Sequence, residues 1–336
     1  MIELGNWATV DGDGLEFEPG TDLLLFLIGP SGEHLFKERS WLRDKEWIRH
    51  RASLEQKWCD GNVWRLVEKG ERGRVLGMRI LFLGDVVAEY GREAVRDGMP
   101  RLIEEFAPDF IVVNGENVAG GNGITPKLAY DIFRAKVDVI TLGDHCWDQR
   151  EIMGFFAEEP RLIRPFNFPA TCPGKGSIVV TGNGKKLGVV NAMGRTFMKA
   201  NVDNPFLMMD PILEELRKET KVILVDFHAE TTSEKIAFGH AFDGKVSAVV
   251  GTHTHVQTAD EKVLAGGTAY ITDVGFCGAH DSVIGREKGF IIDRFRTLMP
   301  VKMHLATAGV QLDGVVIDVD EETGKATAIQ RIQRPK

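Results

Sequence analysis

Several features that mark other protein classes are scarce or absent in this sequence of 336 residues. It has 4 cysteines, at positions 59, 146, 172 and 277, and no Cys-x-x-Cys pair, which argues against a zinc ribbon or a disulfide framework. The longest apolar run, residues 23–28, is far shorter than the roughly 20 residues that span a membrane. No basic segment precedes it, unlike in a signal peptide. We therefore expect a cytoplasmic protein with reduced thiols.

An excess of positive charge is also lacking, because the formal net charge is −8. A broad basic surface for nucleic acid is therefore not expected. Binding of small phosphorylated substrates remains compatible with this charge if bound cations supply the positive charge. The composition, 43% hydrophobic and 27% charged, is that of an ordinary globular protein with a sizeable core.

The sequence changes character at about residue 77. Residues 1–77 hold five of the six tryptophans and only scattered strand-like runs. Residues 68–74 are all Glu, Lys, Gly or Arg, whose codons can be purine-only, as in a ribosome-binding site. We expect an N-terminal extension of unknown role at 1–77, either an over-called start or a small genuine domain, and a main domain at 78–336. A mass measurement of the native protein separates these two explanations.

From Met78 onward, short apolar runs rich in Val and Ile alternate with helical patterns, which predicts an α/β fold with much parallel sheet. The predicted strands are 79–83, 110–114, 137–142, 177–180, 187–191, 222–226, 246–250, 269–272 and 314–319, the last forming a hairpin with 326–332. The predicted helices are 92–106, 126–136, 210–219 and 289–298.

Residues of metal-ligand types follow five of these strands. They are Asp85, then Glu116 and Asn117, then Asp144 and His145, then His228, and finally His253 and His255. Ligands of open α/β sheets bind beyond the carboxyl ends of the strands, so these clusters are predicted to converge on one rim. Each cluster alone could be an ordinary turn or a helix cap. Their joint occurrence indicates a site.

Charge explains why such a site would need cations. Carboxylates within a few ångströms of one another resist joint ionisation, and a cation removes that conflict. Carboxylate, amide and imidazole donors without thiolate suit iron, manganese or zinc better than magnesium, which prefers an all-oxygen shell. The seven candidate ligands, which are these residues without His145, exceed the needs of one tetrahedral ion. This favours two ions about 3.5–4 Å apart with a bridging carboxylate.

Other motifs carry weaker signals. If residues 253–255 are extended, His253 and His255 point to the same face and can each reach one metal. Cys146 beside His145 could be a nucleophile, but a structural thiol is the better interpretation. The glycine-rich segment 120–123 lacks the Gly-Lys-Ser/Thr of a P-loop and is interpreted as a loop at the rim of the metal site.

With these residues in view, the chain from Met78 to about Ile332 resembles the YmdB-like phosphodiesterase family, a branch of the calcineurin-like metallophosphoesterases. The resemblance lies in 78–87 (MRILFLGDVV), 114–117 (NGEN), 164–169 (RPFNFP), 194–197 (GRTF), 225–230 (VDFHAE), 251–260 (GTHTHVQTAD) and 272–275 (TDVG). Residues 1–77 have no counterpart in it.

The resemblance implies a four-layer α/β/β/α sandwich with mixed sheets and a dinuclear centre. It implies that Asp85, Glu116, Asn117 and His255 bind one metal, that Asp144, His228 and His253 bind the other, and that Glu116 bridges. His145 would be the catalytic proton donor. The family usually has Asn where this chain has Asp144. The extra charge should tighten metal binding and weaken Lewis acidity, and Asp144 could accept a hydrogen bond from His145.

The implied activity is hydrolysis of cyclic nucleotides, such as 2′,3′-cyclic or 3′,5′-cyclic AMP. We expect metal-bound hydroxide to attack phosphorus and His145 to protonate the leaving ribose oxygen. A phosphomonoesterase such as a nucleotidase, or a regulatory nucleotide-binding metalloprotein of low turnover, are the alternatives. The expected partner is a small phosphodiester or nucleotide, without a membrane or a stable nucleic-acid complex. Association of identical chains stays open.

Overall fold

The computed structural model describes residues 9–11, 14–16, 22–28, 34–41, 67–68 and 77–336. The chain divides into two units, Met1–Val75 and Leu76–Lys336. In the first unit, β1 (Thr9–Asp11) pairs with β2 (Gly14–Glu16), and β3 (Asp22–Ile28) pairs with β4 (His34–Trp41) and β5 (Val67–Glu68), all antiparallel. Whether residues 1–77 are an over-called start or a small genuine domain of unknown role stays a prediction.

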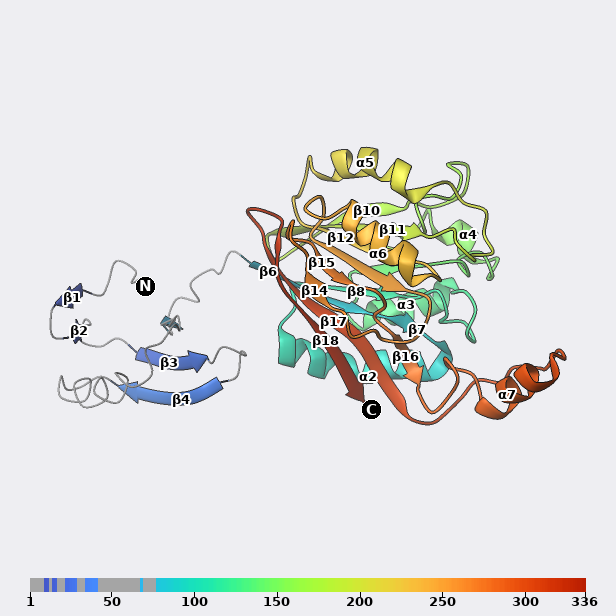
Figure 1. Cartoon of the computed structure of the whole chain (residues 1–336), viewed down its shortest axis with the longest axis horizontal. Helices are drawn as coiled ribbons and strands as arrows, with labels where there is room; N and C mark the ends of the chain where they lie inside the picture. Colours follow the sequence, from blue (N-terminus) through green and yellow to red (C-terminus); the bar gives the residue numbers. More distant parts are fainter. Residues whose placement is uncertain (1–8, 12–13, 17–21, 29–33, 42–66, 69–76) are drawn as a thin grey trace. The chain divides into compact units, whose positions relative to one another are not determined.

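The second unit contains two mixed sheets that pack face to face (Figure 1). The first sheet has the order β7-β16-β17-β6-β8-β9, with β18 along β17. Its strands are β6 (Gly77–Leu83), β7 (Asp85–Val86), β8 (Phe110–Asn114), β9 (Val139–Thr141), β16 (Phe276–Ala279), β17 (Val310–Asp320) and β18 (Ala326–Pro335). Strands β6, β8 and β9 are parallel, whereas β17 is antiparallel to β6 and forms the predicted hairpin with β18.

The second sheet has the order β10-β11-β12-β13-β15-β14. Its strands are β10 (Ser177–Gly182), β11 (Lys185–Met193), β12 (Ile223–His228), β13 (Ala248–Thr252), β14 (Lys262–Val263) and β15 (Ala269–Ile271). The four central strands, β11, β12, β13 and β15, are parallel. Parallel strands buried on both faces explain the nearly continuous apolar runs of the sequence.

Alternation along the strands builds the layers. On β6, Ile80 and Phe82 face the second sheet, whereas Leu81 and Leu83 face a cluster that contains residues of two helices. These helices are α2 (Ala88–Phe106) and α3 (Pro126–Arg134). The outer face of the second sheet packs against α5 (Pro205–Leu216) and α6 (Thr232–Ala241). The predicted α/β/β/α sandwich is therefore confirmed.

Two further helices, α4 (Ile152–Phe155) and α7 (Lys288–Thr297), do not belong to these layers. The short helix α4 was not predicted from the sequence. Helix α6 of the outer layer was not predicted either. Helix α7 extends away from the sandwich (Figure 1). Within the described part of the chain, no helix is both long enough and apolar enough to cross a membrane.

Candidate metal centre

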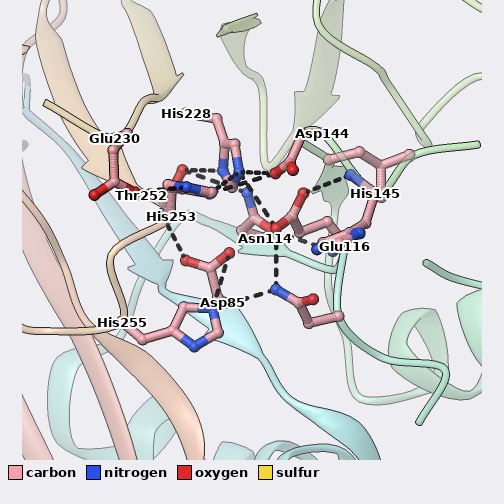
Figure 2. Close-up of polar contacts among 12 residues, drawn as sticks. Asp85, Asn114, Glu116, Asp144, His145, His228, Glu230, Thr252, His253 and His255 are labelled. Atoms are coloured by element: carbon pink, nitrogen blue, oxygen red, sulfur yellow. Dashed lines mark hydrogen bonds and ion pairs between the residues drawn. The ribbon is translucent and has the colours of Figure 1, made fainter. Parts of the chain in front are cut away.

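The predicted site residues meet where the carboxyl ends of the strands face one another across the two sheets (Figure 2). The first sheet supplies five of them, at or just after β6, β8 and β9: Asp85, Glu116, Asn117, Asp144 and His145. The second sheet supplies the other three, at the end of β12 and just after β13: His228, His253 and His255. The site is thus assembled from both halves of the sandwich.

The tightest cluster contains Glu116, Asp144, His228 and His253, whose potential ligand atoms all lie within 4.8 Å of one another. Asp144 Oδ1 is 3.2 Å from His228 Nε2 and 3.3 Å from His253 Nδ1. Glu116 Oε1 is 3.3 Å from His228 Nε2. Two imidazole nitrogens and two carboxylates therefore point at a common space. A set of donors of these types suits a transition metal.

A second group lies beside the first and shares Glu116 with it. Asn117 Nδ2 is 3.0 Å from Glu116 Oε1 and 3.2 Å from His255 Nε2. His255 Nε2 is 3.9 Å from Asp85 Oδ1, a buried oxygen that has no hydrogen-bond partner within residues 77–336. A buried carboxylate oxygen left without a donor is costly, and a cation would satisfy it.

Each of the three histidines makes a polar contact through its far ring nitrogen. His228 Nδ1 is 2.9 Å from Thr252 Oγ1, His253 Nε2 is 3.0 Å from Glu230 Oε2, and His255 Nδ1 is 3.2 Å from the Ile284 carbonyl oxygen. The near nitrogen of each ring faces the carboxylates. Outer partners of this kind fix the tautomer and orientation of metal-binding histidines.

The contact of His228 identifies its tautomer. Thr252 Oγ1 donates its one proton to Asp226 Oδ1 at 2.7 Å, so it must accept from His228 Nδ1–H. A bound metal would require the neutral form of His228, whose Nε2 lone pair would then face the space beside Glu116 and Asp144. Asp226 is fully buried, which raises its pKa to about 6, and it also accepts from Thr141 and Asn114.

The charges at the centre are strongly coupled. Burial raises the pKa of Asp85. Burial also opposes ionisation of Asp144, but hydrogen bonds from His228 and His253 outweigh it and hold the pKa of Asp144 well below its usual range. Burial disfavours protonation of His228, yet Glu116 and Asp144 raise the pKa of His228 well above its usual value. The fold thus gathers negative charge that protons or cations must balance.

A glycine makes the close approach of Glu116 and His228 feasible. A Cβ atom at Gly143 would lie 2.2 Å from Glu116 Oε2 and 2.3 Å from His228 Nε2. No side chain fits there without displacing both groups. Gly143 directly precedes Asp144. The turn after β9 therefore places the Asp144 carboxylate at the site and leaves room there for Glu116 and His228.

The predicted extended conformation of residues 253–255 is wrong. Strand β13 ends at Thr252, and His253 and His255 have φ angles of 101° and 61°. Because of this turn the two rings face different groups, His253 toward Asp144 and His255 toward Asn117. Both still reach the centre, but through backbone strain rather than strand geometry.

His145 lies at the edge of the cluster and is 26% exposed. Its backbone N–H donates to Glu116 Oε2 at 3.2 Å, and its ring Nδ1 lies 2.8 Å from Asp148 Oδ2 and 3.2 Å from Asn122 Nδ2. The carboxylate that contacts the His145 ring is therefore Asp148, and not Asp144, which the sequence also allowed. Cys146, in contrast, is buried in the core, and burial raises the pKa of its thiol.

The sequence did not identify the residues that orient the site. They are Asn114, Thr141, Asp148, Asp226, Glu230 and Thr252. Asp226 gave a usable signal, because it is an acidic residue inside an otherwise apolar strand. Asn122 lies in the glycine-rich segment 120–123, and its contact with His145 agrees with the predicted place of that loop beside the site.

Comparison with known proteins gives a consistent picture. The family described as YmdB-like protein matches residues 81–332. The 2′,3′-cyclic-nucleotide 2′-phosphodiesterase of Bacillus subtilis (strain 168) is 50% identical over 255 residues, which cover 76% of this chain and 96% of that protein.

Two crystal structures are also similar. A hypothetical protein from Thermus thermophilus superposes with a TM-score of 0.72 at 39% identity and covers 77% of this chain, with all of that chain matched. A novel phosphatase from Mycoplasma pneumoniae also has a TM-score of 0.72, at 34% identity, over 77% of this chain and 94% of that chain. The matched region, the identity and the shared fold show that this chain belongs to the YmdB-like protein family.

Proposed function

We propose that the protein is a metal-dependent phosphodiesterase that hydrolyses cyclic nucleotides. Its general class, a metallophosphoesterase hydrolase, agrees with the family and with the names of its relatives. The name of the Bacillus subtilis relative makes 2′,3′-cyclic nucleotides the first substrates to test. The observation that carries the proposal is the set of three histidines whose near nitrogens face buried carboxylates while their far nitrogens contact outer partners.

Two cations would fit these donors. Asp85, Glu116, Asn117 and His255 would hold one, and Asp144, His228 and His253 the other, with Glu116 shared because it lies in both groups. A 180° flip of the Asn117 amide would present its oxygen as the ligand. The absence of thiolate among the donors favours iron or manganese, and zinc also accepts them. When bound, the ions would supply Lewis acidity toward a phosphodiester and a water molecule.

His145 is the proposed general acid. Hydrolysis adds water to phosphorus and breaks one bond from phosphorus to a ribose oxygen, which then needs a proton. Asp148 and Asn122 both contact Nδ1, which leaves Nε2 as the ring nitrogen that can give a proton to this oxygen. The backbone bond from His145 to Glu116 fixes the distance between the acid and the metal site.

Positive charge outside the metal site supports an anionic substrate. Arg286 donates to the Gly121 carbonyl oxygen at 3.2 Å and to Asn122 Oδ1 at 3.0 Å, so it borders the loop that contacts His145. Within residues 77–336 it has no carboxylate partner. Its burial lowers the pKa of the guanidinium.

The deciding experiment combines elemental analysis of the purified protein with a substrate panel. The panel contains 2′,3′-cyclic AMP, 3′,5′-cyclic AMP, a chromogenic phosphodiester and the corresponding monoester, each tested after loading with manganese, iron or zinc. Turnover of cyclic nucleotides supports the proposal. Preference for the monoester would instead favour a phosphomonoesterase. A nucleotide that binds but is not hydrolysed would favour a regulatory protein.

A further inference from the structure

A buried ion pair lies behind the metal site and takes no part in the proposed reaction. Lys235 Nζ, on α6, is 2.6 Å from Asp273 Oδ2, just after β15, and both side chains are 1% exposed. The stem of Lys235 passes directly beside the end of β13, because a Cβ at Gly251 would lie 3.1 Å from Lys235 Cδ. Two charges removed from water are costly unless their geometry satisfies them, so their position calls for an explanation.

Asp273 contacts the turn that bears two of the histidines. Its Oδ2 accepts hydrogen bonds from the Thr254 backbone N–H at 3.1 Å and from Thr254 Oγ1 at 2.8 Å. The preceding amide, that of His253, donates to Asp85 Oδ2 at 3.1 Å. Two successive amides of the turn are therefore held by two different buried carboxylates.

The same carboxylate also fixes the segment on which Asp85 rests. Asp273 Oδ1 accepts from the Gly275 backbone N–H at 2.9 Å. The Gly275 carbonyl oxygen in turn accepts from the Asp85 backbone N–H at 3.3 Å. One side chain thus joins the histidine turn of the second sheet to the start of β7 in the first.

Backbone strain explains why the turn needs such support. His253 and His255 both have positive φ angles, a region that costs free energy for a residue with a Cβ. Strained residues keep their conformation only where their surroundings enforce it. Thr254, the residue between them, donates the hydrogen bonds that Asp273 accepts.

We propose that Lys235 and Asp273 are positioning residues of the metal centre, which hold residues 253–255 in the strained turn that aims His253 and His255 at the metals. This inference rests on the proposed function, because it assumes that both histidines bind metal. Asp273 anchors the turn, and Lys235 offsets the negative charge that this anchor places beside Asp85.

The test is titration of Mn²⁺ into the metal-stripped full-length chain by calorimetry. The double variant Lys235→Met with Asp273→Asn removes both charges together and keeps an acceptor oxygen. We expect its Mn²⁺ affinity to fall about 10–100-fold, as for other residues that orient metal ligands. The rise in melting temperature on Mn²⁺ addition should shrink accordingly. A purely structural pair would lower the metal-free melting temperature and leave that rise unchanged.

A milder variant covers the case in which the double variant does not fold. Thr254→Val removes only the hydroxyl bond to Asp273, and we expect a several-fold loss of Mn²⁺ affinity that Thr254→Ser restores. Asp243→Asn is the matched control, because Asp243 accepts from the Gly266 and Thr268 backbone N–H groups and contacts neither Asp273 nor residues 253–255. Its affinity should equal that of the wild type.

Two results separate the possible failures. Wild-type affinity in a folded double variant, or in Thr254→Val if the double variant is unfolded, would overturn the inference. A wild-type chain that binds none of Mn²⁺, iron or zinc would contradict the proposed function itself, and this outcome is visible before any variant is measured.

Discussion

Glu116 and His228 come from different sheets, yet Glu116 Oε1 lies 3.3 Å from His228 Nε2. Glu116 follows β8 of the first sheet, and His228 is the last residue of β12 in the second. Their contact requires the two sheets to be packed at a fixed spacing by the apolar layer between them, which includes Phe82 and Leu224. The geometry of the site therefore depends on the packing of the sandwich.

The first prediction concerns His145. His145→Ala should keep its metal content, because the ring lies outside the ligand cluster, and should lose about 10²–10⁴-fold in kcat on 2′,3′-cyclic AMP. The loss should be much smaller on an aryl phosphodiester, whose leaving group needs no proton. Steady-state kinetics on both substrates measure this difference, and an equal loss on both would contradict the acid role. Asp148→Asn should show the same substrate pattern with a smaller loss.

The second prediction concerns the acidic residue at position 144. Asp144→Asn removes one negative charge from the cluster, so metal affinity should fall about 10-fold and turnover at saturating metal should rise. Both changes have one cause, since less ligand charge attracts the cation less and leaves it a stronger Lewis acid. Calorimetric titration and kinetics at fixed free metal test it. A variant that binds metal more tightly than the wild type would refute this interpretation.

The third prediction uses two glycines. Gly143→Ala places a methyl group against Glu116 and His228, so it should abolish metal binding and destabilise the fold by about 1–3 kcal/mol, as overpacking does. Gly154→Ala in α4 is the control, because nothing lies within 4 Å of its added Cβ. The control should retain full activity and equal or higher stability. Denaturant unfolding and elemental analysis compare the two.

The fourth prediction concerns the tautomer of His228. Thr252→Val removes the acceptor of His228 Nδ1–H and the donor to Asp226, so metal affinity should fall about 10-fold. Thr252→Ser keeps the hydroxyl group and should bind as the wild type does. Equal affinity of the valine and serine variants, measured by titration of Mn²⁺, would show that the hydrogen bond does not orient the ring.

Much of this arrangement could be predicted from the sequence. The strand at 110–114 has the predicted bounds, and the five clusters of candidate ligands lie at or just after strand ends. Apolar periodicity and strand-end chemistry are local signals. They were sufficient to place Asp85, Glu116, His228 and the other candidates on one rim.

The parts that were missed depend on contacts between distant segments. Helix α6 lacks a clear apolar period, partly because one of its buried residues is Lys235, which is neutralised by Asp273. The strand predicted at 246–250 lies two residues further along, at Ala248–Thr252. The turn at His253 is held by hydrogen bonds to Asp85 and Asp273, which are distant in the sequence, so no local sequence pattern predicts it.

The central claim is that two cations bind where the sheets meet, and anomalous diffraction from crystals of manganese-loaded protein tests it most directly. We predict two anomalous peaks, one contacting Asp85, Glu116, Asn117 and His255 and the other contacting Glu116, Asp144, His228 and His253. A map from fully loaded crystals that lacks an anomalous peak at one or both positions would contradict the account.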